Sequence, residues 1–228
     1  MSKSLRTKAI VLRRTNYGEA DRILQVITPE NGRLSVMARS VRKEKSRLAG
    51  GIELFAICDI VVHLGKGEIG TLTGAKLNNF FDQIMTDYNR LQFGYEVIKK
   101  VASASETVDE PEFYNLLQAC FEALNNLKID LKLIQAWFYL NIAELLGNGL
   151  NTATDNNGMK LVEDANYSFD TRDQVFVFAE NNQGQYTSDH IKLLRVMSTN
   201  KPAIAAKISG IEEVVEDCLR LAMIAAKV

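Results

Sequence analysis

The first 80 residues carry a short-period pattern of apolar and polar positions that predicts β-strands. Runs rich in β-branched residues are separated by turn residues, and in the fourth run apolar side chains occupy alternate positions. The five runs are Lys8–Arg14, Arg22–Thr28, Arg33–Arg39, Phe55–Leu64 and Ile69–Lys76. Five strands in about 70 residues, with no helix-length insert, favour a small closed barrel of the oligonucleotide-binding (OB) type.

From about residue 82 the apolar positions recur at steps of three and four, which predicts helices. The segment Leu131–Gly147 is apolar on nearly every side, which indicates the buried centre of a small bundle. The stripe expected to be buried in the first helix is Ile84, Tyr88, Leu91, Tyr95, Ile98 and Ala102, and that in the second is Phe113, Leu117, Cys120, Leu124 and Leu127.

A polar segment, Asn148–Gly158, separates these helices from a mixed C-terminal region. We expect a strand at Gln174–Phe178, a short helix from about Thr187 to Met197 and a final helix after Pro202. The stripe expected in the final helix is Ile211, Val215, Cys218, Ala222 and Ala225. The pattern thus predicts an α+β protein with an OB-type barrel at 1–80, an all-helical bundle at 81–148 and a small C-terminal α/β region at 149–228, packed with the bundle.

One motif in the barrel region matches a dinucleotide-binding loop. Gly65-Lys66-Gly67-Glu68-Ile69-Gly70 fits the pattern G-x-G-x-x-G and follows a predicted strand. In that fingerprint the last glycine opens a helix whose amides hold a pyrophosphate, whereas Thr71–Gly74 is strand-like. We therefore predict a hairpin here and no nucleotide site.

The formal net charge of −1 conceals a basic N-terminal region. Residues 1–80 hold 14 Lys and Arg against 7 Asp and Glu, a net of +7, whereas residues 81–228 hold 13 against 21, a net of −8. The densest group of cations surrounds a single acid, Glu44, in the segment Ala38–Gly51. Such asymmetry indicates a polyanion-binding module, and a solvated loop is the alternative interpretation.

The predicted phosphate contacts follow from this cluster. Aromatic residues are scarce in the barrel region, chiefly Tyr17 and Phe55, so we expect backbone contact to outweigh base stacking. The residues predicted to contact the phosphates of a bound polyanion are Arg39, Arg42, Lys43, Lys45 and Arg47, with Lys8, Arg13, Arg14 and Lys66 extending the basic face.

The cysteines and histidines form no recognisable reactive group. Cys58, Cys120 and Cys218 are widely spaced and are expected to be buried, reduced thiols, while His63 and His190 lie in no catalytic pattern. The chain starts with no apolar signal segment, and its longest uncharged apolar run is too short to span a membrane. We expect a cytoplasmic protein that is not an enzyme and has no membrane contact.

Four short motifs of the N-terminal third occur together in one known family. They are Tyr17-Gly18-Glu19 with Asp21, the turn Thr28–Gly32, the basic loop ending in Ser46–Gly51, and Gly70–Thr73. With the helical middle and small C-terminal region that follow, the chain resembles the bacterial recombination-mediator and DNA-repair family RecO. In that family the Tyr-Gly-Glu-Asp segment is expected to shape a barrel turn and to make no ligand contact.

The resemblance implies a non-catalytic role in DNA repair without a cofactor. It implies binding of single- and double-stranded DNA and annealing of complementary strands. It also implies cooperation with RecR and the C-terminal tail of the single-strand-binding protein SSB, indirect contact with RecA in its loading, and a nucleoid-associated location in the cytoplasm. The alternatives are an RNA-binding OB protein, which competition between DNA and RNA of equal length would reveal, and a scaffold without nucleic-acid affinity at physiological salt.

Two features depart from the family pattern. Many relatives carry two CxxC pairs that bind zinc in the C-terminal domain. Here Thr154 and Asn157 stand where the first pair would fall, and no cysteine lies between Cys120 and Cys218, so we predict no metal site. Ser40 stands where relatives usually have a glycine, which concerns the local conformation of the basic loop.

Overall fold

The computed structural model describes residues 3–108, 111–180 and 183–227, and the chain divides into two compact units. The first unit is Met1–Asn125 and the second is Asn126–Val228. This division falls inside the stretch 81–148, which the sequence groups as one bundle. The three-part division into 1–80, 81–148 and 149–228 stays a prediction.

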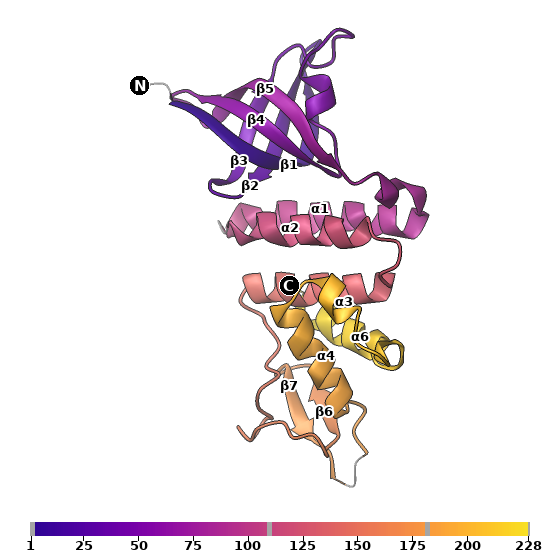
Figure 1. Ribbon diagram of the computed structural model, residues 1–228. Helices are drawn as coiled ribbons and strands as arrows, with labels where there is room; N and C mark the ends of the chain where they lie inside the picture. The colour runs from indigo at the N-terminus through magenta and orange to yellow at the C-terminus, as the bar shows by residue number, and fades with distance from the viewer. Residues whose placement is uncertain (1–2, 109–110, 181–182, 228) are drawn as a thin grey trace. The chain divides into compact units, whose positions relative to one another are not determined.

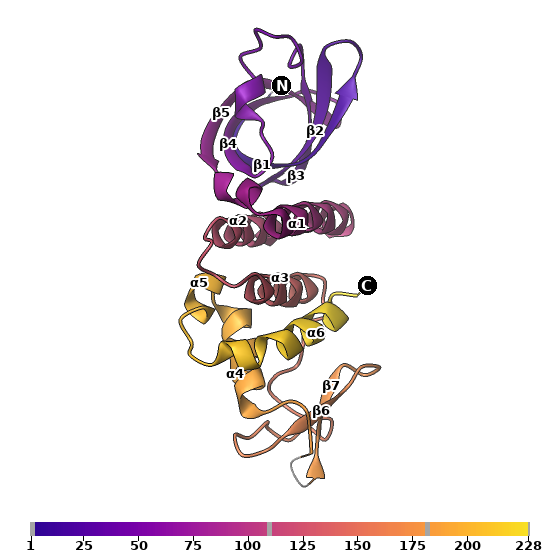
Figure 2. The ribbon, with the colours of Figure 1, turned by 90° about the vertical axis from the view of Figure 1, so that its right-hand side faces the viewer.

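The first unit begins with a closed five-stranded barrel, which confirms the predicted fold class (Figures 1 and 2). The neighbours follow the order β1-β2-β3-β5-β4, and β4 pairs back onto β1 to close the barrel. All pairs are antiparallel except β3 with β5, which are parallel. The strands are β1 (Lys3–Tyr17), β2 (Asp21–Thr28), β3 (Gly32–Ala38), β4 (Ala56–Leu64) and β5 (Ile69–Phe80).

Two predicted turns are confirmed. The turn before β3 ends at Gly32, whose φ of 55° is the left-handed conformation that glycine adopts without steric cost. The glycine motif forms the turn of a hairpin, because β4 ends at Leu64, β5 begins at Ile69 and the two strands pair antiparallel. No helix follows that glycine motif, as the prediction of a hairpin requires.

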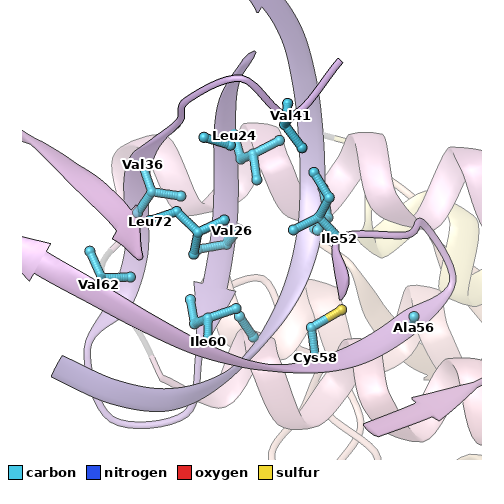
Figure 3. Packing of buried hydrophobic residues seen from close by; sticks show 13 residues of the cluster. Leu24, Val26, Val36, Val41, Ile52, Ala56, Cys58, Ile60, Val62 and Leu72 are labelled. Carbon is cyan, nitrogen blue, oxygen red and sulfur yellow. The ribbon is translucent and has the colours of Figure 1, made fainter. Parts of the chain in front are cut away.

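The barrel interior is filled by alternate side chains of its strands. In β4 the residues Ala56, Cys58, Ile60 and Val62 are buried, as their spacing predicts, while His63 is exposed. Figure 3 shows Leu24, Val26, Val36 and Leu72 from other strands gathered with them. Two further residues in this cluster, Val41 and Ile52, come from the connection between β3 and β4, which holds a short 3-10 helix, η1 (Ala49–Gly51).

A 3-10 helix and two α-helices complete the first unit: η2 (Asp82–Thr86), α1 (Tyr88–Thr107) and α2 (Glu112–Leu124). The stripe predicted in α2 is buried at Phe113, Leu117, Cys120 and Leu124, whereas Leu127 lies beyond the helix and is exposed. Buried Arg90 of α1 donates a hydrogen bond from its guanidinium to the Leu124 carbonyl at 3.0 Å, which ties α1 to the end of α2.

The stripe predicted for the first helix is right at Ile84 and Ile98, which are buried, and wrong at its two tyrosines. Its buried face is built around Phe93, Val97 and Val101, whereas Tyr88 is 73% exposed and Tyr95 is 47% exposed. The predicted stripe was counted from Ile84, which lies in the separate helix η2. The Asp87 side chain accepts the Arg90 backbone N–H at 3.0 Å and starts a new helix, so the periodicity is interrupted between these elements.

The second unit holds four α-helices, a two-stranded antiparallel sheet and a 3-10 helix among its described residues (Figure 1). In the last helix Val215, Cys218, Ala222 and Ala225 are buried as predicted, while Ile211 lies outside it and is only partly buried. The elements are α3 (Leu131–Leu145), β6 (Tyr167–Asp170), β7 (Val175–Phe178), α4 (Ser188–Thr199), α5 (Pro202–Ala205), η4 (Ile211–Glu213) and α6 (Val215–Ala225). The pattern predicted β7 but neither β6 nor α5, although each of the three is four residues long.

Candidate nucleic-acid interface

The basic loop, residues 39–47, is a fixed part of the barrel. Val41 is only 3% exposed and Ile52 only 2%, and both side chains lie in the barrel core (Figure 3). Leu48 and Ala49 pack partly against the same core. Burial of a Val or Ile side chain contributes about 1.5–3 kcal/mol each, so the loop is attached on both sides of its cations.

The start of the basic loop is hydrogen-bonded to the hairpin between β1 and β2. The Ser40 backbone N–H donates to Asp21 Oδ1 at 2.7 Å, and the Arg42 backbone N–H donates to the Ala20 carbonyl at 2.9 Å. The Arg42 guanidinium also donates to the Gly18 carbonyl at 3.3 Å. The Tyr17–Asp21 motif therefore has a structural role, because it fixes where the basic loop begins.

The backbone at Ser40 accounts for the glycine that relatives place there. Its φ is 55°, in the left-handed region, although Ser40 carries a side chain. Glycine adopts this conformation without a Cβ clash, so either residue can make the turn into the basic loop. Ser40 in place of the expected glycine therefore keeps the loop conformation, and its Cβ adds a steric cost.

The cations of the basic loop are exposed and have no acidic partner. Among residues 3–108, 111–180 and 183–227, no carboxylate oxygen lies within 4.0 Å of any of their charged nitrogens. The single acid of the segment, Glu44, is itself exposed. The exposed cations are Arg39, Arg42, Lys43, Lys45 and Arg47. Their positive charge is available to an external anion.

Of the other predicted contacts, Arg13 and Arg14 lie on β1 just before the hairpin to which the start of the basic loop is hydrogen-bonded. Both are exposed on β1, just after a bulge at which the pairing with β2 shifts between Val11 and Arg13. Arg14 forms an ion pair with Glu53 at 3.4 Å, which offsets part of its charge. Arg13 has no such partner among the described residues.

The structure does not bring Lys8 and Lys66 to the basic loop. Because β3 and β5 are parallel, the turn carrying Lys66 before β5 lies at the end of the barrel where β3 starts, and the basic loop follows the opposite end of β3. Lys8 lies in the middle of β1, opposite Asp59 of β4. These two lysines belong to other parts of the barrel surface.

Lys8 lines a shallow groove of about 510 Å³ on the outside of β1, β4 and β5. Two more cations, Arg6 and Lys76, line it together with Asp59, and Lys76 is the β5 partner of Asp59. Sequence reasoning missed Arg6 and Lys76. Only the neighbour order of the strands places them beside Lys8, and no signal in the sequence states that order.

The described residues offer no metal centre. No three of their His, Cys, Asp and Glu side chains are grouped so that they could hold a metal ion. Where the family zinc pair would begin, the Thr154 hydroxyl accepts a hydrogen bond from the Asn151 side chain at 2.8 Å. Nearby, the Asn157 N–H donates to Asp155 Oδ1 at 2.9 Å. This loop is held by hydrogen bonds and contains none of the thiolates that a tetrahedral zinc site uses.

The three thiols are buried and have no feature of an activated nucleophile. Burial raises the pKa of Cys58 to about 11 and that of Cys218 to about 12, and it raises the pKa of Cys120 further. All three are free cysteines. They are packing residues, as their positions on apolar stripes predict.

The N-terminal region of the chain matches a known family. Residues 1–81 match the family described as "Recombination protein O N terminal". This is the segment that forms the barrel and the basic loop.

Among the described residues, no helix has both the length and the apolar character needed to cross a membrane.

Several curated proteins named "DNA repair protein RecO" are similar to the chain. The protein of Dehalococcoides mccartyi is 34% identical over 143 residues, which are 62% of this chain and 56% of that protein. The protein of Rubrobacter xylanophilus is 31% identical over 142 residues, 62% of this chain and 57% of that protein. That of a Roseiflexus species is 34% identical over 144 residues, 62% of this chain and 50% of that protein. The chain spans about half the length of the curated relatives it matches.

Proposed function

We propose that this chain, whose residues 1–81 match the N-terminal model of the RecO family, is a DNA repair and recombination protein that binds DNA without catalysing a reaction on it. The names of the similar proteins support the role in DNA repair. The observation that supports DNA binding is the basic loop, whose cations are held by the barrel and left without acidic partners.

The finer proposal concerns what the protein does with DNA. It binds single- and double-stranded DNA, anneals complementary strands and, with RecR on DNA coated by SSB, helps to load RecA. Two strands repel each other through their phosphates, and cations that neutralise those phosphates lower the repulsion and release counterions. Such contact is independent of sequence, which suits a protein that must accept any damaged DNA.

We assign the phosphate contacts chiefly to the basic loop. Arg13 extends this surface along β1, and Arg14 contributes less because Glu53 pairs with it. Lys8 and Lys66 lie on other parts of the barrel surface, so DNA bound to the basic loop would contact them only if it extended beyond the loop. The proposed contacts within the loop are Arg39, Arg42, Lys43, Lys45 and Arg47.

A triple substitution tests this assignment. Lys43, Lys45 and Arg47 are exposed, and within the described residues no side-chain hydrogen bond or ion pair of theirs holds the loop, whereas Arg42 is hydrogen-bonded to Gly18. Replacing these three residues by Ala should flatten the log–log salt dependence of single-strand binding by about 2, at roughly 0.7 per phosphate contact. Affinity should fall similarly for all sequences, measured by fluorescence anisotropy at several salt concentrations.

The matched control removes three exposed lysines of the second unit, Lys160, Lys207 and Lys227. It changes the net charge equally but removes none of the proposed phosphate contacts, so it should leave the slope as in the parent protein. Neither variant should change the unfolding free energy by more than about 0.5 kcal/mol. An unaltered slope in the folded loop variant would show that the loop is merely solvated.

Strand annealing tests the function itself. The protein should accelerate annealing of complementary single strands, both bare and coated with SSB, and the loop variant should do so less than the lysine control. No acceleration of bare strands would contradict the mediator function. A preference for RNA over DNA of equal length in competition would favour the RNA-binding alternative instead.

A further inference from the structure

A groove of about 390 Å³ lies between the barrel and α1 inside the first unit. Its lining includes Leu12 and Arg13 of β1, Gln25 of β2, and Tyr95, Lys99 and Ser103 of α1. The volume is within the range of small-molecule and cofactor sites. The function proposed above uses only Arg13 of these residues.

Tyr95 presents an exposed aromatic ring in this groove. It lies on the stripe that the sequence predicts to be buried, yet it is 47% exposed. Buried Phe55 braces the ring from behind, with the two ring centroids 5.1 Å apart and the planes at 69°. A Cβ added to Gly94 would lie 2.7 Å from Phe55 Cε1, so the glycine makes room for this contact. The result is an aromatic surface that is fixed in place and open to solvent.

The charge around the groove is positive. Arg13 and Lys99 are exposed, and no described carboxylate pairs with either of them. The one acid in the lining, Glu106, pairs with Arg33 at 2.9 Å. The Gln25 amide and the Ser103 hydroxyl add neutral donors and acceptors.

We propose that this groove binds single-stranded DNA, with one unpaired base stacked on Tyr95 and the adjoining phosphates at Arg13 and Lys99. The proposal rests on the DNA-binding function above and adds a contact that only single strands can make. Aromatic rings flanked by cations are how proteins hold single strands without reading sequence. The barrel strands offer few aromatics, so a ring from α1 supplies the stacking surface.

The position of Arg13 links the groove to the basic loop. Arg13 lies four positions before Tyr17 in β1, which is about 13 Å along a strand, and the hairpin after Tyr17 holds the start of the loop. A DNA backbone neutralised by the loop can therefore continue along β1 to the groove. This continuity favours DNA over an acidic peptide as the occupant.

Tyr95→Leu is the first test, because it keeps apolar volume and removes the π face. Affinity for single-stranded oligothymidylate should fall about 5- to 150-fold, the loss expected for one base–aromatic stack. The salt slope and the affinity for duplex DNA should not change, because no phosphate contact is lost and duplex bases are already stacked. Tyr95→Phe should bind like the parent protein. Tyr88→Leu, on the same helix but outside the lining, is the matched control.

An abasic oligonucleotide separates stacking from a general loss of structure. It keeps the phosphates and lacks the bases, so the parent protein and Tyr95→Leu should bind it equally. If Tyr95→Leu unfolds, Ser103→Glu replaces it, since this exposed position lines the groove and a carboxylate there should repel the phosphates. If the parent protein fails to bind single strands, the proposed function falls as well.

If the parent protein binds and Tyr95→Leu binds with equal affinity, only the groove assignment is overturned. The same holds if the substitution weakens binding of an acidic peptide and leaves DNA affinity unchanged. A smaller affinity loss on the abasic oligonucleotide than on oligothymidylate supports the stack.

Discussion

Ser40 is a residue at which the backbone conformation matters more than the side chain. Its φ of 55° turns the chain from β3 into the basic loop, and its N–H is fixed by Asp21. A left-handed conformation costs a residue with a Cβ about 1–2 kcal/mol, and glycine avoids this cost. We predict that Ser40→Gly raises the free energy of unfolding by up to about 1 kcal/mol in urea denaturation and leaves DNA binding unchanged.

Ser35→Gly is the comparison, because Ser35 lies inside β3, where it pairs with Gln25 of β2. There glycine should lower stability by roughly 0.5–1 kcal/mol, since it adds freedom to the unfolded chain and contributes nothing to the strand. A loss of similar size at both positions would mean that the turn at Ser40 carries no strain. The sequence identified Ser40 as a departure from the family but could not show its φ, which depends on the hydrogen bond to Asp21.

At the scale of elements, alternation and helical spacing predicted the strands well and the buried face of α1 only in part. The strands of the barrel were predictable because a closed sheet buries every second side chain, as Cys58 and Ile60 do in β4. The buried face of α1 was not predictable in this way, because two apolar stripes of the helix fit the same spacing of three and four. Counting only apolar residues also overlooks Gly94, whose missing side chain admits Phe55. For the same reason the groove at Tyr95 could not be predicted.

The start of α4 contains a histidine that should make the second unit sensitive to pH. His190 Nδ1 accepts the Thr187 backbone N–H at 3.1 Å, as part of a capping box. Burial lowers the pKa of His190 from its ordinary 6.5, and Asp217 nearby opposes this shift. As pH falls below 6.5 the unfolded chain therefore takes up the proton first. The stability that neutral His190 contributes is complete above pH 6.5 and is lost as pH falls through the lowered pKa.

His190→Gln isolates this effect, because a Gln at the same position can still accept the N–H but does not titrate. In urea denaturation, the stability of the parent protein relative to this variant should be smaller at pH 5 than at pH 8. His63→Gln on the exposed face of β4 is the control. A relative stability that is the same at both pH values would contradict a role for His190 protonation.

At the scale of the whole molecule, the sequence separates a basic first part from an acidic remainder. Residues 1–80 carry a net +7 and residues 81–228 a net −8. This asymmetry predicted which part bears the candidate DNA site, because the charge of a segment can be counted from the sequence without knowledge of the fold. It could not predict that Lys66 and the basic loop lie at different ends of the barrel, which follows from the strand order.

The donor groups of the C-terminal region predict that the protein folds without zinc. Thr154 and Asn157 replace cysteine ligands in a loop that hydrogen bonds already hold. Purified protein should contain far less than one zinc per chain by elemental analysis, and a chelator should not change its melting temperature. Stoichiometric zinc would show that other residues form a site.

The strand order of the barrel also governs when the chain can fold during synthesis. The last strand made, β5, lies between β3 and β4, so the four earlier strands form one open sheet in the order β3-β2-β1-β4, whose two edges stay unpaired until β5 arrives. Until Phe80 has left the ribosome, those edges can pair with a neighbouring nascent chain. The two edges are therefore protected from misassembly in one step, late in the synthesis of the first 80 residues, when β5 pairs with both of them and closes the barrel.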